Sequence, residues 1–325
     1  MKTKIVYTLV SSEKDIYLEQ LWVSIYSLRL YNSEAHVIVL VDDKTNETLT
    51  GYRAVIKELA NEIIVVETPQ SYTPKERSRE IKTSIRKHVK GDFLFLDTDT
   101  VICDQLDEID NLIDMDIAIV SDFHVPFSAY PFKSYIVEIM KKIFDIDVSE
   151  VKDYFNSGAM YVRDTERSHL FFDAWNKNWT HSAFKKGNSQ DQPALMKTNY
   201  DFNSLIKELD GSYNCQIAAS IKYLHEAKVI HFFNARFFGD TNYSPFFRTD
   251  FYLDIRKNAA LTACHIECIA NCKNSFEAFT TPIGRKEFEF LTSPFGNRLN
   301  KIYQEQGLCF KCLDFFLKIK NRIIG

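Results

Sequence analysis

The sequence predicts an α/β fold with a mostly parallel sheet and helices on both of its faces, followed by a helical C-terminal appendage. Two observations support this prediction. Short apolar, β-branched runs alternate with segments whose apolar residues recur at helical spacing, and this alternation fades after about residue 240. Strands that alternate with helices pair in parallel, because each helix returns the chain to the end of the sheet at which the previous strand began.

The individual elements follow from these two patterns. We expect strands at residues 5–10, 36–41, 62–66, 93–96, 117–120 and 159–162. We expect helices at residues 18–28, 45–60, 75–89 and 132–144, and later ones at 250–258, 261–273, 285–291 and from about 308. The predicted division is a main domain over residues 1–240 and an appendage over residues 241–325.

Composition and charge argue against several classes of protein. The net charge of −4 gives no electrostatic basis for binding nucleic acid. Seven cysteines, an odd number in a chain long enough to form a full hydrophobic core, favour a reducing compartment over secretion. The first apolar run is too short for a signal peptide, and no run reaches the length of a membrane span. We therefore expect a cytoplasmic protein.

Two carboxylates, Asp97 and Asp99, directly follow the predicted strand at residues 93–96. In a doubly wound sheet the ligand site lies at the carboxyl ends of the strands, where this pair is expected. Hard divalent cations prefer carboxylate oxygens, and a diphosphate can supply further ligands. A cation held there stabilises negative charge on a departing diphosphate. As purely structural residues, the same aspartates would cap a following helix, a role that Asp104 or Asp107 would also fit.

Residues 93–101 (FLFLDTDTV) resemble the strand and Asp-x-Asp motif of GT-A-fold glycosyltransferases, and most closely those of the retaining family 8 type. The resemblance covers about residues 4–240. It implies that residues 1–240 form a nucleotide-sugar-binding catalytic domain with a GT-A fold, which is built on a Rossmann-like sheet. It also implies transfer of a hexose from a UDP-sugar to an acceptor hydroxyl, with retention of the anomeric configuration. The acceptor would be a surface glycan, a lipid-linked sugar or a protein.

The resemblance further implies roles for single residues, because several short motifs occur in the order and spacing of the family. Asp97, Asp99 and His231, the last in a strand-like run at 229–232, would hold Mn²⁺ or Mg²⁺. The residues that would contact the donor, besides Asp97, are Tyr7, Thr8, Lys82, Thr98, Asn156, Ser157 and Gly158. Asp191 and Gln192 match an acidic-amide pair, which places one of them near the anomeric carbon in catalysis.

The segment after His231 departs from the family pattern. Family 8 enzymes continue with a His-x-x-Gly-x-x-Lys-Pro-like segment whose Lys contacts the diphosphate, whereas residues 231–239 read HFFNARFFG. We expect Arg236 to replace that lysine as a donor-binding cation, because a guanidinium binds phosphate well.

Structural interpretations of the same residues stay open. His231 lies among apolar residues and would also fit a hydrogen-bonded core histidine. Ser189 or Asp191 would cap a helix whose first turn contains Pro193. Residues 156–158 would form a turn in which the glycine lets the backbone approach a ligand closely.

The basic and acidic residues near the predicted donor site have structural interpretations as well. Lys82 would be one of several solvated cations on its helix. Asp42 and Asp43, at the end of the second predicted strand, would be either turn residues or contacts to the base or ribose.

The appendage contains two features of its own. Cys264, Cys268 and Cys272 fall on one face of a single predicted helix, where buried structural cysteines fit better than a zinc site of unusual spacing. The last helix mixes aromatic and aliphatic residues with four cations. It would lie on the inner face of an anionic membrane or, alternatively, dock on the main domain.

Two other functions remain as alternatives to glycosyl transfer. A nucleotidyltransferase that makes nucleotide-sugars would share the sheet and the metal, but it opens with a Gly-rich loop, and residues 11–15 (SSEKD) contain no glycine. A non-catalytic glycan-binding protein would not need both Asp97 and Asp99.

Overall fold

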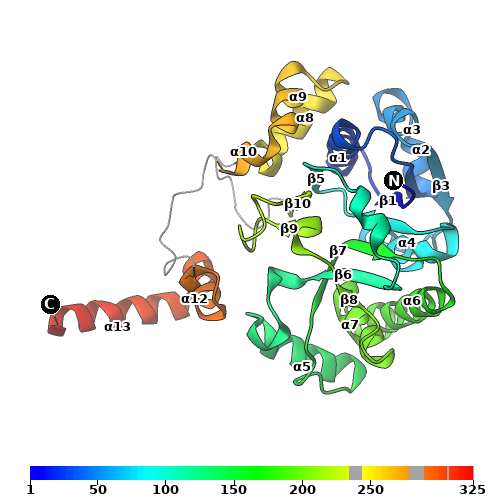
Figure 1. The fold of residues 1–325 in the computed structure, drawn as a ribbon. Helices are drawn as coiled ribbons and strands as arrows, with labels where there is room; N and C mark the ends of the chain where they lie inside the picture. The colour runs from blue at the N-terminus through cyan, green and yellow to red at the C-terminus, as the bar shows by residue number, and fades with distance from the viewer. Residues whose placement is uncertain (234–243, 278–288, 306, 325) are drawn as a thin grey trace.

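The computed structural model describes residues 1–233, 244–277, 289–305 and 307–324, and its centre is a seven-stranded sheet (Figure 1). The strand order is β3-β2-β1-β4-β7-β6-β8. The strands are β1 (Lys4–Leu9), β2 (Val37–Asp42), β3 (Glu62–Val66), β4 (Phe93–Leu96), β6 (Ile117–Ser121), β7 (Phe155–Val162) and β8 (Lys207–Glu208). Only β7 runs antiparallel to its neighbours, β4 and β6. The predicted α/β fold with a mostly parallel sheet is therefore confirmed.

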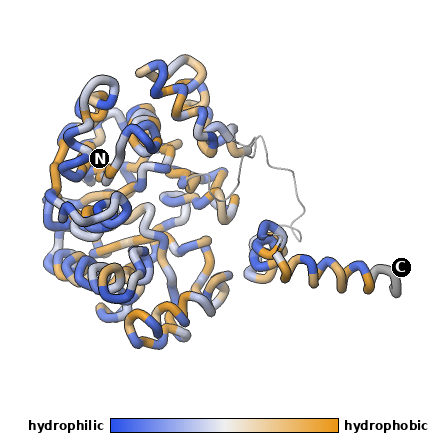
Figure 2. Tube along the Cα trace, turned by 180° about the vertical axis from the view of Figure 1, so that it is seen from behind, coloured by the Kyte–Doolittle hydropathy of each residue, from blue (hydrophilic) through white to orange (hydrophobic). Residues whose placement is uncertain are grey.

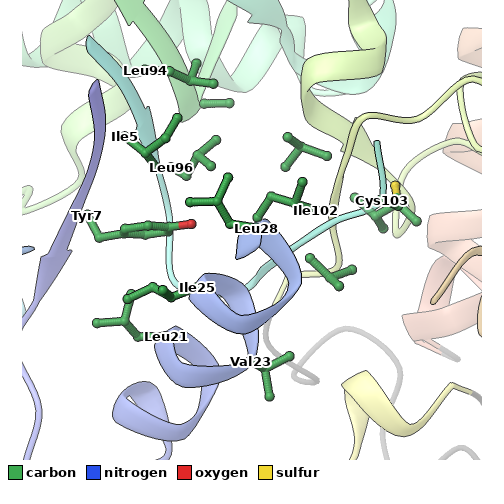
Figure 3. Packing of buried hydrophobic residues seen from close by; sticks show 14 of the residues in the cluster. Ile5, Tyr7, Leu21, Val23, Ile25, Leu28, Leu94, Leu96, Ile102 and Cys103 are labelled. Carbon is green, nitrogen blue, oxygen red and sulfur yellow. The ribbon is translucent and has the colours of Figure 1, made fainter. Parts of the chain in front are cut away.

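Helices cover both faces of this sheet because alternate strand residues point to opposite sides. On one face Ile5 and Leu94 lie in an apolar cluster with Leu28 of helix α1 (Tyr17–Tyr31), and Figure 3 shows part of this cluster. On the other face Val6 and Phe95 lie in a second apolar cluster. The helices of that second cluster are α4 (Pro74–His88), α6 (Glu166–Lys186) and α7 (Asp191–Asp201). Helix α5 (Lys133–Phe144) contributes to a third, smaller cluster.

A three-stranded sheet, in the order β5-β10-β9, lies beside the carboxyl end of β4. Its strands are β5 (Thr100–Ile102), β9 (Cys215–Gln216) and β10 (Val229–His231). Strand β10 pairs antiparallel with β5, so that His231 faces Thr100, and parallel with β9, so that His231 also faces Gln216. This pairing brings a residue from late in the chain beside the loop that follows β4.

Two predicted helices are interrupted. The predicted helix at 45–60 is replaced by α2 (Asp43–Thr48), a short 3-10 turn and α3 (Val55–Leu59), because Gly51 adopts a positive φ of 56° that a helix does not allow. The predicted helix at 261–273 ends at Ala270, where Asn271 separates α9 (Ala263–Ala270) from α10 (Cys272–Glu277). The three cysteines therefore do not share one continuous helix face.

The segment after residue 244 has two parts. Helix α8 (Thr249–Asn258) and α9 contribute Ile255 and Ile269 to the same apolar cluster as β1. Helix α12 (Pro294–Glu305) and helix α13 (Leu308–Ile324) follow, and α13 projects away from the rest of the molecule (Figure 1). Apolar and polar residues alternate along α13 in Figure 2. Within the described ranges, no helix is both long and apolar enough to cross a membrane.

Candidate functional site

Asp97, Asp99 and His231 form a cluster at the carboxyl end of β4. One ligand atom from each lies within 4.8 Å of the others, and this is the only group of three or more such side chains among residues 1–233, 244–277, 289–305 and 307–324 that can hold a metal ion. The backbone fixes the loop, since Asp97 N donates to Gly158 O at 2.8 Å and Phe232 N donates to Asp99 O at 3.2 Å. Two carboxylates and an imidazole are suitable ligands for a divalent cation.

The imidazole of His231 is held in one orientation by Asn214. The ring Nδ1 lies 3.0 Å from Asn214 Oδ1, while Asn214 Nδ2 donates to Asn156 Oδ1 at 3.1 Å. Because the amide oxygen of Asn214 is an acceptor, Nδ1 must carry the proton. In the neutral ring the lone pair on Nε2 then faces Asp99 Oδ1, 3.3 Å away. This is the tautomer that a metal-binding histidine requires.

Gly158 makes room for the same ring. A Cβ atom at this position would lie 2.2 Å from His231 Cε1, a distance at which one of the two groups must move. The sequence interpretation assigned this space to a ligand, whereas the structure fills it with the histidine side chain. The glycine therefore contributes to the site indirectly, by letting β7 approach β10.

Two cations from helix α4 lie behind the aspartates. Lys82, only 2% exposed, donates from Nζ to Asp97 Oδ1 at 3.0 Å and lies 3.6 Å from Asp191 Oδ2. Arg79 Nε lies 3.0 Å from Asp191 Oδ1, and the carboxylate of Asp191 raises the pKa of this arginine. Lys82 is therefore buried among carboxylates and is not the solvated cation of the structural interpretation.

Asp191 is a buried anion at the start of helix α7. The residue before it, Gln190, occupies the capping position, so neither Ser189 nor Asp191 is the cap that the sequence predicted. Burial by itself raises the pKa of Asp191, but Arg79, Lys82 and the hydroxyl of Ser157 hold this pKa well below its usual range. Both carboxylate oxygens are thereby occupied by protein groups.

A second buried carboxylate, Asp122, lies just after β6 and was not recognised in the sequence. Its oxygens accept hydrogen bonds from Tyr130 (2.7 Å), Asn156 (3.0 Å) and Gln192 (3.4 Å). Burial raises the pKa of Asp122, although these three hydrogen bonds oppose the shift. Gln192 Nε2 also donates to Phe155 O at 3.1 Å.

A cavity of about 580 Å³ opens beside the cluster. Its lining residues are Thr8, Leu9, Val10, Tyr17, Thr73, Pro74, Lys75, Ser78, Arg79, Asp97, Thr98 and Asp99. Of the sequence-predicted residues, Thr8 and the Asp97–Asp99 triplet line this cavity, whereas Tyr7 does not. The side chain of Tyr7 is fully buried, and its hydroxyl lies 3.0 Å from Ser24 Oγ in the core (Figure 3). Arg236 lies outside the described residues.

Other sequence candidates have structural partners. Asp42 is fully buried, caps helix α2 through Thr45 N and pairs with Arg77 Nε at 2.6 Å. Asp43 accepts a hydrogen bond from Gln70 at 2.9 Å. Both therefore have the turn roles that the sequence left open.

The cysteines of the appendage differ in environment. Cys264 is exposed, Cys268 is half-buried, and Cys272 is buried against the main apolar cluster. His265 is also buried, and its Nδ1 lies 2.8 Å from Thr262 Oγ1. Among the described residues no cysteine belongs to a cluster that can hold a metal.

Comparisons with known proteins identify the family of the chain. The profile of the nucleotide-diphospho-sugar transferase family matches residues 88–254, just over half of the chain, and no curated protein sequence matches. Among solved structures, the WbbM bifunctional glycosyltransferase matches with a TM-score of 0.52 and 16% identity, over 82% of this chain and 50% of that one. The chain therefore spans half the length of WbbM.

Two further solved structures are similar at lower scores. Mouse xyloside xylosyltransferase 1 has a TM-score of 0.48 and 13% identity, over 71% of this chain and 97% of that one. The galactosyltransferase LgtC, solved with donor and acceptor sugar analogs, also has a TM-score of 0.48 and 13% identity, over 87% of this chain and 98% of that one. By the family match, the chain belongs to the nucleotide-diphospho-sugar transferase family and is a glycosyltransferase.

Proposed function

We propose that this enzyme transfers a hexose from a UDP-sugar to an acceptor hydroxyl, using Mn²⁺ or Mg²⁺ held by Asp97, Asp99 and His231. The observation that supports the proposal best is the position of the three ligands. Asp97 and Asp99 line a cavity of about 580 Å³, and His231 reaches them from another sheet. A cation bound there supplies Lewis-acid stabilisation of the departing diphosphate.

The diphosphate would lie between this cluster and the cations of helix α4. Arg79 lines the cavity, and Lys82 lies directly behind Asp97. Guanidinium and ammonium groups stabilise phosphate oxygens through charge-assisted hydrogen bonds. Arg236 would add a further cation from outside the described residues. Thr8 and Tyr17, which also line the cavity, would contact the nucleoside.

The sugar would lie toward Asn156, Asp122 and Gln192. Because Asp191 has both oxygens paired, Gln192 is the better candidate to contact the anomeric carbon, through Oε1. In the reaction the acceptor oxygen bonds to the anomeric carbon as the bond from that carbon to the diphosphate oxygen breaks. The hydroxyl proton leaves with the diphosphate. We propose that this occurs on one face of the sugar, with retention.

We further propose that the acceptor is a glycan or a lipid-linked sugar at the inner face of a membrane. Helix α13 exposes Leu308, Phe315 and Phe316, with exposed fractions of 60% or more, together with exposed Lys311 and Lys318. An amphipathic helix with cations on its polar face binds anionic lipid surfaces.

The test of the proposed function is metal-dependent turnover of a panel of UDP-sugars. We expect the parent enzyme to hydrolyse or transfer one of them only in the presence of Mn²⁺ or Mg²⁺, and the Asp97→Ala, Asp99→Ala double variant to lose this activity. The matched control is Asp104→Ala, Asp107→Ala, outside the cluster. Parent-level turnover by the first variant would show that the cluster assignment is wrong. Release of pyrophosphate from a nucleoside triphosphate would instead indicate a nucleotidyltransferase.

A further inference from the structure

A second cavity, of about 510 Å³, lies at the carboxyl ends of β6 and β8. Its lining residues are Ser121, His124, Val125, Pro126, Lys152, Asp153, Ser204, Ile206, Lys207, Glu208, Lys222 and Tyr223. It shares no lining residue with the first cavity. Its volume falls in the usual range of small-molecule sites, about 300–1,000 Å³. The cavity is therefore large enough for a small-molecule ligand of its own.

Gln216 joins this cavity to the metal-ligand cluster. It is fully buried and pairs with His231 in the small sheet, one strand spacing away. Its backbone N donates to His124 Nε2 at 3.2 Å, and its side chain donates to Ser121 O at 3.0 Å. Ser121 in turn precedes Asp122. The second cavity is thus a direct neighbour of the region assigned above to the donor sugar.

The wall between the two regions has a strained backbone. Phe123 and His124 both have positive φ angles, 59° and 55°, which are uncommon for residues with side chains. Gln216 Oε1 accepts from Phe123 N at 2.9 Å and helps to hold this conformation. Strained backbone of this kind concentrates at binding and catalytic sites, where the surrounding structure maintains it.

An aromatic surface lines the cavity. The rings of His124 and Tyr223 lie 4.7 Å apart, and Gly211 leaves room for Tyr223, whose ring would otherwise meet a Cβ atom at 2.3 Å. Burial lowers the pKa of His124 to about 4, so the ring is neutral at neutral pH. Since Nε2 accepts from Gln216, Nδ1 is a hydrogen-bond donor. Rings with an adjacent donor suit a sugar, which has apolar C–H faces and hydroxyl edges.

Three lysines line the same cavity. Lys152, Lys207 and Lys222 are exposed, and none of them forms an ion pair within the described part of the chain. Lys222 Nζ lies 4.8 Å from the centre of the Tyr223 ring. Two carboxylates are also present, but Glu208 is already engaged, since it accepts from Ser121 N at 2.9 Å and from Ser121 Oγ at 2.5 Å. The cations outnumber the carboxylates.

We propose that this cavity binds the acceptor, and that the acceptor is a sugar carrying a phosphate or a carboxylate. The sugar packs on Tyr223 and His124, and its anionic group lies against Lys207 and Lys222. That the ligand is the acceptor of the reaction rests on the proposed function. That the ligand is an anionic sugar follows from the cavity alone.

The test compares glucose 6-phosphate, glucuronic acid, glucose and inorganic phosphate as probes, with binding to the full chain measured by saturation-transfer NMR. We expect at least one anionic sugar to bind more tightly than glucose and inorganic phosphate, and the two sugars distinguish phosphate from carboxylate. The Lys207→Gln, Lys222→Gln variant should weaken that binding about tenfold, or about 1.4 kcal/mol. Tyr223→Ala should also weaken the binding of glucose. The matched control is Lys185→Gln, Lys186→Gln on helix α6, which should bind as the parent does.

Three results would overturn the proposal: anionic sugars binding no more tightly than glucose, equal binding of inorganic phosphate and glucose 6-phosphate, or unchanged binding in the lysine variant. Metal-dependent hydrolysis of the UDP-sugar is measured in parallel and should persist in the lysine variant. If the parent hydrolyses no UDP-sugar yet binds anionic sugars through these lysines, the proposed function fails and the ligand class stands. If hydrolysis occurs without such binding, only this inference fails.

Discussion

At the scale of single residues, a chain of hydrogen bonds runs through the candidate site from the imidazole of His231 to the buried carboxylate of Asp122. His231 contacts Asn214, Asn214 contacts Asn156, and Asn156 contacts Asp122. All of these side chains are buried, so each partner fixes the orientation of the next. The metal-ligand cluster and the proposed sugar region are therefore positioned by one network.

Replacing Asn214 should weaken metal binding although all three proposed metal ligands are kept. The Asn214→Leu variant removes the acceptor that keeps the proton on Nδ1 of His231, and we expect Mn²⁺ affinity to fall about 10- to 100-fold. Electron paramagnetic resonance of free Mn²⁺ measures this affinity. Asn214→Asp, which keeps an acceptor for Nδ1, should bind Mn²⁺ within a few-fold of the parent. Equal affinities for all three proteins would contradict the positioning role.

Asp191 should make the fold sensitive to acid. Its pKa is lower in the folded chain than the unfolded value of about 3.9, so its contribution to stability is fully present above that value. The contribution is lost as the pH falls through the unfolded value toward the lower folded pKa. We expect Asp191→Asn to be less stable at neutral pH, because Arg79 loses the carboxylate that it pairs with and Lys82 loses one of its two carboxylates. Its free energy of unfolding should also decrease less below pH 4 than that of the parent, as measured by urea unfolding.

The candidate site residues that could be predicted from the sequence are those whose signal is local. The Asp97–Asp99 triplet follows an apolar strand, and His231 ends another. Tyr7 was assigned to the cavity, but strand alternation places it on the same core face as Ile5. Asp122 and Asn214 were missed because each is a single polar residue with no motif around it.

At the scale of elements, the strands that the sequence predicted begin and end within about a residue of the observed ones, except for β7, which begins at Phe155. The short strands β5, β8 and β9 were not predicted. A strand that is covered on both faces of the sheet has apolar residues at consecutive positions, and such a run is easy to recognise in the sequence. The helix interruptions at Gly51 and Asn271 were not predicted, because a single residue with special backbone geometry leaves the apolar periodicity almost unchanged. The pairing of β10 with β5 joins residues distant in sequence, and local pattern says nothing about it.

Helix α13 should control membrane binding. The Phe315→Asp, Phe316→Asp variant places charge on its apolar face, and we expect it to lose sedimentation with phosphatidylglycerol vesicles. The control is Ile113→Asp, Tyr135→Asp, because those residues are similarly exposed, at 63% and 57%, but lie elsewhere. Hydrolysis of the UDP-sugar should be unchanged in both variants. Undiminished vesicle binding by the first variant would rule out this role for the helix.

At the scale of the whole molecule, helix α8 is joined to the sheet body by a buried ion pair. Arg256 Nε lies 2.8 Å from Glu19 Oε1, and the Glu19 side chain is fully buried. Together with the apolar contacts of Ile255, this pair makes residues 249–258 part of the main core, although the sequence assigned them to the appendage.

Removing Arg256 should destabilise the fold much more than removing a surface arginine. Arg256→Ala leaves the buried carboxylate of Glu19 without its cation, with the hydroxyl of Tyr52 still donating to it, and loss of the cation costs about 3–5 kcal/mol. Arg248→Ala breaks an exposed pair with Asp250 and should cost about 1 kcal/mol or less. Urea unfolding of the two variants measures the difference. Similar values for both would mean that α8 is held by its apolar contacts alone.

The antiparallel pairing of β10 with β5 has a further consequence. Asp99 immediately precedes β5, and His231 ends β10, so the chain between them forms a closed loop that contains β6, β7, β8 and helices α5 to α7. A cation bound by both side chains would hold the two ends of this loop together in the folded chain. Because it binds the folded chain in preference to the unfolded one, it would stabilise the fold by mass action. The ion proposed for catalysis would therefore also stabilise the C-terminal half of the sheet.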